Sequence, residues 1–366
     1  MGNYKLILSI VLMGCALNLW AQNDPIKIET KVEEPPKQIP KEDSISLANA
    51  YFKKGITQSL LYQNYKEGIL SFSKSINLNP NNATAYYNRG YALMKVNELE
   101  EAINDFEKSL ALNDKNKKAL LNLGKCFTLV GNQKNALEVY EKALLLDNGY
   151  AAVHYNMGIS YGALNEKAKA IEAYNKAIKF DPNKASYFFN RALMFQEIGN
   201  MPSALNDFKK ASELDKEDPN IQFALGFLYL NQRIPEEAIE AFNAAIAMDS
   251  SYWNAYFNRG LVFLEQLEFE KAASDLNTYT ANIKDDPLGF FYAGKANMEK
   301  GDMYKAMNDF ESSVSLNPEF GWSNYYLGYV MINSFGKFEG CAYLEKAKNM
   351  GVAEAERTLK IACVNK

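Results

Sequence analysis

Few side chains in this sequence have the reactivity that catalysis or metal binding requires. The chain of 366 residues has one histidine, His154, and four cysteines. Nucleophilic catalysis needs a nucleophile beside a base, and a zinc site needs closely spaced Cys and His ligands. His154 has no such context along the chain, the cysteines lack metal-ligand spacing, and the glycines form no phosphate-binding loop. We therefore expect no enzymatic activity, no metal site and no cofactor.

The cysteines offer redox chemistry instead. Cys341 and Cys363 flank a predicted helical hairpin that turns near residues 349–352, so their backbones can approach each other. Two alternatives stay open. A disulfide would hold the C-terminal hairpin in an oxidising compartment, whereas two separate packed thiols, which we slightly favour, would need no such compartment. Cys126 lies within a predicted helix, where we expect it to be buried.

The first 22 residues have the pattern of an export signal. Lys5 precedes an apolar run over residues 6–21, and the chain becomes polar directly after Ala21. The run is shorter than the roughly 20 residues of a typical membrane-spanning helix. We therefore expect an exported protein of the periplasm or the outer membrane; an uncleaved N-terminal anchor is a less favoured alternative.

Two processing routes compete for this signal. Cleavage after Ala21 would release a soluble protein. Residues 12–15, Leu-Met-Gly-Cys, resemble a bacterial lipobox, in which Cys15 would carry a lipid anchor. We favour soluble release, because residues 16–21 stay apolar where a lipoprotein tether is usually polar. Residues 23–44 then form a linker, since four of the chain's 11 prolines lie there among Lys and Glu residues.

A period of 34 residues organises the remainder of the chain. One register holds a small residue eight times in succession: Gly90, Gly124, Gly158, Ala192, Gly226, Gly260, Gly294 and Gly328. A second small residue usually follows twelve positions later, and a large apolar residue follows four positions after that. An earlier copy around Gly55 fits if one residue is inserted between its two helices. The chain therefore contains nine repeated units.

Each unit has two stretches with apolar residues at helical spacing. Residues that tolerate left-handed backbone geometry separate the two stretches, at Asn97, Gly131, Asn165, Gly199 and Gly301. The small residues allow the two helices to cross closely, and the large apolar residue fills the space between them. Because each helix is short, a hairpin of this kind depends on its neighbours for burial.

This arrangement resembles the tetratricopeptide-repeat family over residues 45–350. The resemblance implies an all-α, right-handed α-α superhelical solenoid of about nine repeats, with residues 351–366 as a C-terminal capping helix. The first helix of each repeat would line a concave groove. Tyr279 stands where a small residue is expected and Pro287 comes three residues late, so we expect a distorted joint over residues 277–287.

In this family, the side chains three residues before and one residue after the small residue of the first helix point into the groove. The resemblance therefore implies a partner-binding groove of Tyr87, Tyr91, Leu121, Lys125, Tyr155, Ile159, Phe189, Phe223, Phe227, Phe257, Phe291, Lys295, Tyr325 and Tyr329. Nearly all of these side chains are apolar or aromatic, which favours docking of an extended peptide or an apolar helix. The alternative is that much of the row belongs to the core between repeats.

The function that we expect is a non-enzymatic scaffold for protein–protein interaction in the bacterial cell envelope. A glycan- or peptidoglycan-binding module that uses the same groove is the alternative; few Asp, Asn or Trp residues accompany the aromatic ones, so we favour a protein or peptide partner. Nucleic acid is disfavoured as a partner by the net charge of −4. Membrane contact would come only from a lipid on Cys15. The sequence specifies neither the identity of the partner nor the oligomeric state.

Overall fold

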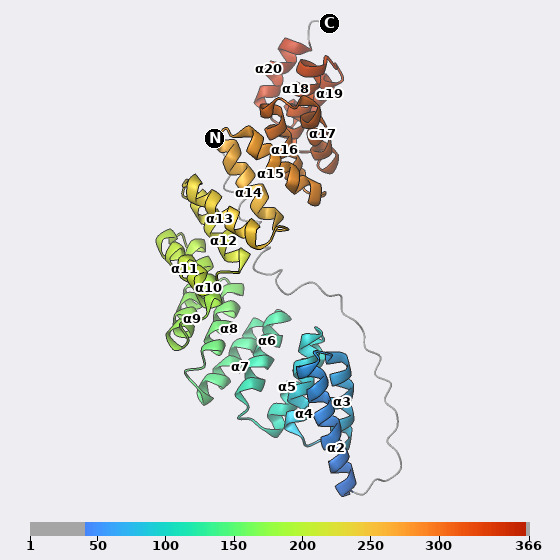
Figure 1. Cartoon of the computed structure of the whole chain (residues 1–366), viewed down its shortest axis with the longest axis vertical. Helices are drawn as coiled ribbons and strands as arrows, with labels where there is room; N and C mark the ends of the chain where they lie inside the picture. Colours follow the sequence, from blue (N-terminus) through green and yellow to red (C-terminus); the bar gives the residue numbers. More distant parts are fainter. Residues whose placement is uncertain (1–40, 364–366) are drawn as a thin grey trace. The chain divides into compact units, whose positions relative to one another are not determined.

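The structure is a computed structural model that describes residues 41–363, and every regular element in that range is a helix (Figure 1). The predicted signal, the lipidation candidate Cys15 and most of the predicted linker lie outside the described residues. The chain divides into two units at residues 182 and 183. No helix of the described part is long and apolar enough to cross a bilayer.

The first unit consists of helix pairs in chain order. Its elements are α2 (Lys41–Ile56), the π-helix η2 (Thr57–Leu61), α3 (Tyr65–Leu78), α4 (Ala83–Lys95), α5 (Leu99–Leu112), α6 (Lys117–Leu129), α7 (Gln133–Leu146), α8 (Ala151–Ala163) and α9 (Lys167–Phe180). A continuous cluster of buried apolar side chains runs from Ile69 to Ala173 through this unit. The pairs therefore share one core rather than having a core each.

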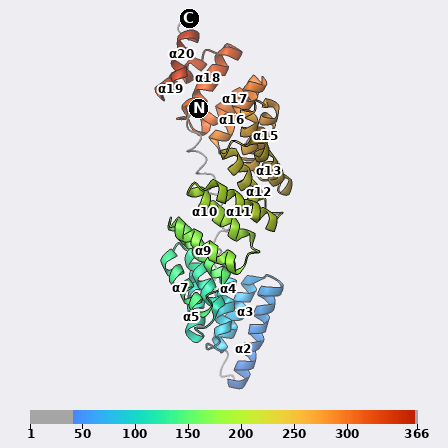
Figure 2. The ribbon, with the colours of Figure 1, turned by 90° about the vertical axis from the view of Figure 1, so that its left-hand side faces the viewer.

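The second unit continues the same pattern. Its elements are α10 (Ala185–Glu197), α11 (Met201–Leu214), α12 (Pro219–Asn231), α13 (Pro235–Met248), α14 (Trp253–Glu265), α15 (Phe269–Asn282), α16 (Pro287–Lys300), α17 (Met303–Leu316), α18 (Gly321–Phe335), α19 (Gly340–Asn349) and α20 (Ala353–Ala362). Within each unit, consecutive helices lie side by side in both views (Figure 1 and Figure 2). The predicted all-helical fold of paired helices is confirmed.

A steric constraint sets the distance between the two helices of a pair. The ring of Phe242 in α13 lies against Gly226 in α12, and a Cβ atom added at Gly226 would come within 2.7 Å of that ring. At Gly124, an added Cβ would overlap the ring of Tyr140. The repeated small residues are therefore required by close helix crossing, as the sequence predicts.

The turns within the pairs use left-handed backbone geometry. Asn97, Asn165 and Gly199 have φ angles of 64°, 60° and 79°, which Gly and Asn adopt at low cost. The first pair carries the extra residue that the sequence predicts between its two helices. There the chain forms η2, and Gln63 takes the left-handed conformation with φ 52°. A π-helical turn is the usual way in which a helix absorbs one inserted residue.

The joint between the seventh and eighth pairs departs from the other joints, because α15 and α16 pack against each other more closely than the helices at the other joints do. Tyr279 is buried against Gly289 of the next helix, which leaves room for its ring, and its hydroxyl donates a hydrogen bond of 2.9 Å to Oδ2 of Asp286. Pro287 begins α16, where a proline needs no N–H partner. The expected irregularity is therefore a closer approach of α15 and α16 with an exchange of side-chain sizes across the joint, and both elements remain regular helices.

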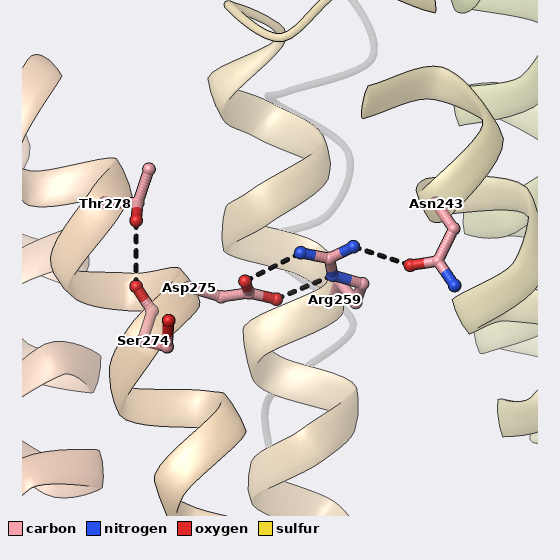
Figure 3. Close-up of polar contacts among 5 residues, drawn as sticks. All are labelled: Asn243, Arg259, Ser274, Asp275 and Thr278. Carbon is pink, nitrogen blue, oxygen red and sulfur yellow. Dashed lines mark hydrogen bonds and ion pairs between the residues drawn. The ribbon is translucent and has the colours of Figure 1, made fainter. Parts of the chain in front are cut away.

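In three helix pairs, an arginine of the first helix forms an ion pair with an aspartate of the second helix. The sequence analysis did not single out these arginines. These ion pairs are Arg89–Asp105, Arg191–Asp207 and Arg259–Asp275, and in each the Nε and Nη2 atoms donate to the two carboxylate oxygens over 2.7 Å. In Figure 3, Nη1 of Arg259 also reaches Oδ1 of Asn243 in the preceding pair, over 2.5 Å. Each bidentate contact fixes two helices against each other.

The eighth pair keeps the acid of this arrangement without the arginine. Asp309 corresponds to Asp275, but Ala293 stands where Arg259 stands in the seventh pair. Nδ2 of Asn297 donates to Oδ2 of Asp309 over 2.7 Å. Burial raises the pKa of Asp309 to about 6, against the opposing effects of the Asn297 hydrogen bond and the charge of Lys305. The folded state thus holds a carboxylate whose ionisation it disfavours.

The C-terminal end is closed by α20, which packs on α19. Cys341 and Cys363 form a disulfide with Cα atoms 6.1 Å apart, which is the less favoured of the two alternatives that the sequence leaves open. Cys126 is a buried free thiol, and burial raises its pKa to about 12. It is therefore a packing residue with little thiolate at neutral pH.

The substitutions Asp309→Asn and Asp275→Asn should change stability in opposite directions. The raised pKa means that Asp309 contributes most to stability below about pH 4 and that this contribution is lost as the pH rises through about 6. Asp309→Asn should therefore stabilise the protein at pH 7.5 by up to about 3 kcal/mol, with a gain that shrinks towards pH 4.5. Asp275→Asn should cost about 3–5 kcal/mol, because Arg259 loses its buried partner. Urea unfolding followed by circular dichroism measures both, and a destabilised Asp309→Asn variant at pH 7.5 would contradict the assignment.

The disulfide predicts a specific thiol count for a chain cleaved after Ala21. In the folded, unreduced protein, no thiol should react with a maleimide, because Cys126 is buried and Cys341 and Cys363 are joined in the disulfide. The denatured, unreduced protein should show one thiol. Three thiols in the denatured protein would exclude the bond.

Candidate functional site

The first helices of the pairs carry the side chains that the sequence assigns to the groove. In the first unit, Tyr87, Tyr91, Tyr155 and Ile159 are half-buried. The rings of Tyr87 and Tyr155 each pack against an aromatic ring of the second helix, at 5.9 and 5.8 Å from Phe106 and Tyr174. These residues therefore combine an inner, packed edge with an edge that is open to solvent.

One cation lies in this row of the first unit. Lys125 is half-buried, and burial lowers its pKa, with the charge of Lys95 acting in the same direction. The neighbouring Tyr87 hydroxyl accepts a hydrogen bond of 3.4 Å from Nδ2 of Asn122, and burial raises the pKa of that hydroxyl. This part of the row is thus polar and positive rather than wholly apolar.

Four of the predicted groove residues are core residues instead. Leu121, Phe223, Phe227 and Phe291 are each at most 7% exposed. The ring of Phe223 lies 5.3 Å from that of Tyr252 in the next repeat and 5.8 Å from that of Phe242. A ligand cannot reach these side chains without unfolding the repeats, so assigning them to the binding surface was wrong.

The reason for this burial is the size of the neighbouring side chains. Phe291 is surrounded by the rings of Tyr292, Phe310, Phe320 and Tyr326, at 5.0–6.1 Å. At Phe291, rings on both sides of the groove position make it part of the core. The periodic pattern marks the direction of a side chain, but its exposure depends on the following unit.

The remaining groove residues of the second unit keep an open edge. Phe189, Phe257, Lys295 and Tyr325 are half-buried, and Tyr329 is 39% exposed. Near Tyr325 and Tyr329, the same helix α18 carries two further aromatic residues, Trp322 and Tyr326, which the sequence analysis missed because it considered two positions per repeat. The spacing of Trp322, Tyr325, Tyr326 and Tyr329 along one helix was the available signal.

The single histidine has a structural environment. His154 is 6% exposed, its Nε2 atom hydrogen-bonds the carbonyl of Asn148 over 2.8 Å, and its ring stacks on Phe180 at 5.6 Å. Burial lowers its pKa, so that the ring is neutral at physiological pH. Within residues 41–363, no group of three or more His, Cys, Asp or Glu residues is placed to hold a metal ion.

Family comparisons identify the repeat. Sequence models described as tetratricopeptide repeat match residues 83–116, 117–150, 151–184, 222–287 and 293–320, and a model described as TPR repeat matches residues 63–97 and 193–232. Together the matches extend over well more than half of the chain. No curated protein sequence matches it.

Solved structures share the fold. The pilF protein of Pseudomonas aeruginosa is 19% identical, over 59% of this chain and 98% of that chain, with a TM-score of 0.53. A chain of the APC/C hetero-tetramer Cut9–Hcn1 is 16% identical, over 80% of this chain and 57% of that chain, with a TM-score of 0.51. YrrB, a TPR protein with an unusual peptide-binding site, is 25% identical over 50% of this chain and 95% of that chain, with a TM-score of 0.41.

Core and surface positions of the row should respond differently to truncation. Phe223→Ala removes a buried ring and should cost about 3–5 kcal/mol of stability. Tyr329→Ala, at an exposed position of the same row, should change stability by about 0.5 kcal/mol or less. Urea unfolding monitored by circular dichroism compares the two variants. Equal effects of the two substitutions would contradict the division of the row into core and surface.

Proposed function

Because the chain belongs to the tetratricopeptide-repeat family, we propose that it is a non-enzymatic scaffold that binds a protein or peptide partner on its first-helix faces. The observation that carries this proposal is the set of half-open side chains at two positions of the repeat. These are Tyr87, Tyr91, Lys125, Tyr155 and Ile159 in the first unit, and Phe189, Phe257, Lys295, Tyr325 and Tyr329 in the second. The rings of Tyr87, Tyr155 and Phe189 each pack against a ring of the second helix, and thus offer apolar surface to a ligand at a low entropic cost.

A glycan or peptidoglycan strand is the second candidate ligand. Trp322, which is 40% exposed beside Tyr325 and Tyr326, favours it, because sugar rings stack on open aromatic faces. Against it, the amide of Asn324 is buried and donates to the backbone carbonyls of Pro318 and Phe320 rather than to open solvent. Hydroxyl groups of a sugar would need such donors. A peptide, whose side chains need apolar contact, fits the available chemistry better.

We also propose that the protein is exported and works in the periplasm or at the outer membrane of a bacterium. The pattern of residues 1–22 supports export, and the Cys341–Cys363 disulfide is of the kind that persists in oxidising compartments. Cleavage after Ala21 remains our favoured processing route over lipidation of Cys15. Residues 23–44 then act as a spacer ahead of the repeats.

Affinity capture in the native host tests the scaffold with matched variants. Wild-type protein, a Tyr91→Ala/Tyr155→Ala variant and a Leu145→Ala control would be cross-linked in intact cells and purified. Leu145 lies on a second helix and is 87% exposed, so its loss should leave the first-helix face intact. We expect the double variant to lose at least one protein that wild type and control both retain, while keeping the same helical content by circular dichroism. Identical captured proteins from all three chains would contradict the proposed binding face.

The route of N-terminal processing can be determined on the same purified protein. Mass spectrometry of the mature N-terminus should find a chain that begins at Gln22. A lipid-modified N-terminal Cys15 would show the alternative route, and an intact Met1 in the cytoplasmic fraction would contradict export.

A further inference from the structure

Helix α18 presents an uncharged aromatic face. No Asp, Glu, Lys or Arg occurs between Gly321 and Phe335. Trp322, Tyr325 and Tyr329 follow at intervals of three and four residues, so they lie on one face of the helix. The ring of Trp322 is 5.9 Å from that of Tyr325, which is 6.1 Å from that of Tyr329. The three rings therefore form one connected surface.

The cap explains why this surface is held in place and yet stays open. Tyr325 packs against the buried cluster of Ala347, Val352 and Ala355 at the α19–α20 turn. Trp322 and Tyr329, on either side of it along the helix, are 40% and 39% exposed. The C-terminal cap thus fixes the middle ring and leaves the outer two for contact with a ligand.

A cation without a counter-ion adjoins this face. The Nζ atom of Lys295 in α16 lies 5.7 Å from the ring centre of Tyr326 and 6.0 Å from that of Phe291. Lys295 is half-buried, and among the described residues it forms no ion pair, including with the exposed Glu299 one turn further along α16. An ammonium group among aromatic rings attracts an anion more strongly than one in open water.

Tyr326 joins the cation to the aromatic face. Its ring is 5.1 Å from that of Tyr325 and 6.2 Å from that of Trp322, while Lys295 lies over it. A ligand that places an anion on Lys295 therefore brings its adjacent groups onto Trp322, Tyr325 and Tyr329. The half-open ring of Phe257 in α14 contacts Tyr292 of α16, the helix that carries Lys295. Half-open aromatic rings of both α14 and α18 thus adjoin α16.

We propose that Lys295 and the aromatic face of α18 form a binding site for an extended acidic segment of a partner protein. The carboxylate of an internal Asp or Glu pairs with Lys295, and apolar residues that flank it pack on Trp322, Tyr325 and Tyr329. An internal acid fits better than a chain end, because half-open rings of α14 and of α18 both adjoin α16, the helix that carries Lys295. This inference rests on the proposed scaffold function and assigns the chemistry of its ligand.

Peptide arrays probed with the mature chain test this site. Ten-residue peptides would carry Glu, Gln or Lys at a central position, between flanks of Leu, Trp or Ser. Binding of the best peptides would then be measured in solution by fluorescence anisotropy. We expect apolar-flanked Glu peptides to bind, and their Gln counterparts to bind roughly tenfold more weakly or worse, because a charge-assisted contact is lost.

Variants separate the roles of the cation and the rings. Lys295→Gln should abolish the preference for Glu over Gln, whereas Lys300→Gln, an exposed lysine at the end of the same helix, should preserve it. Trp322→Ala and Tyr329→Ala should weaken the binding of Glu peptides and of Gln peptides by the same factor. Melting curves by circular dichroism confirm that each variant is folded.

The outcomes distinguish this inference from the scaffold function itself. A Glu preference that survives Lys295→Gln, an array without Glu-dependent binding, or Lys295-dependent binding of an acidic oligosaccharide in place of any peptide would each overturn the acidic-segment site. If native partners captured in cells are lost with Trp322→Ala but retained with Lys295→Gln, the scaffold stands and the assigned ligand chemistry fails. If both variants retain every native partner, this face of the second unit is not a binding face.

Discussion

Close crossing of two helices at a residue without a large side chain is the constraint on which every other feature depends. In the eighth pair, a Cβ atom at Gly294 would come within 2.8 Å of the Phe310 ring, so the ring itself defines how near the helices lie. Once the crossing point is set, the orientation of the first helix follows, and with it the residues that face outward. The residues at the crossing point of each helix pair therefore also determine the direction of the candidate binding side chains.

A regular backbone does not produce a regular surface. Phe223 and Phe257 occupy the same position of their repeats, yet the first is 2% exposed and the second is half-buried. The ring of Phe223 contacts those of Phe227, Phe242 and Tyr252, whereas the ring of Phe257 contacts those of Tyr279 and Tyr292. Polar residues vary in the same way: Arg259 pairs with Asp275, whereas Asp309 has only the amide of Asn297. The periodic fold thus supplies equivalent positions, and local neighbours decide whether each one packs, pairs or remains available.

The helices, their pairing and the turn residues were predictable from the sequence because they follow from local spacing, as at Asn97 and Gly199. The exposure of Phe291 was not, since it depends on rings that the next repeat supplies. The Arg259–Asp275 ion pair was not predicted, because its two residues are separated by sixteen positions and the same combination occurs in only three of the described helix pairs. The Cys341–Cys363 bond stayed open for a different reason: spacing permits a disulfide without requiring it.

The two ends of the described chain differ in how freely they can open. Repeat arrays lose structure most easily from their terminal units, because these have a neighbour on one side only. At the C-terminal end, the disulfide closes a loop of 22 residues around the last hairpin, so α20 cannot peel away from α19 while the bond is intact. At the N-terminal end, α2 and α3 are joined through the irregular η2 turn and have no covalent restraint. Amide hydrogens should therefore exchange faster in the first helix pair than in the last, and reduction of the bond should remove that asymmetry.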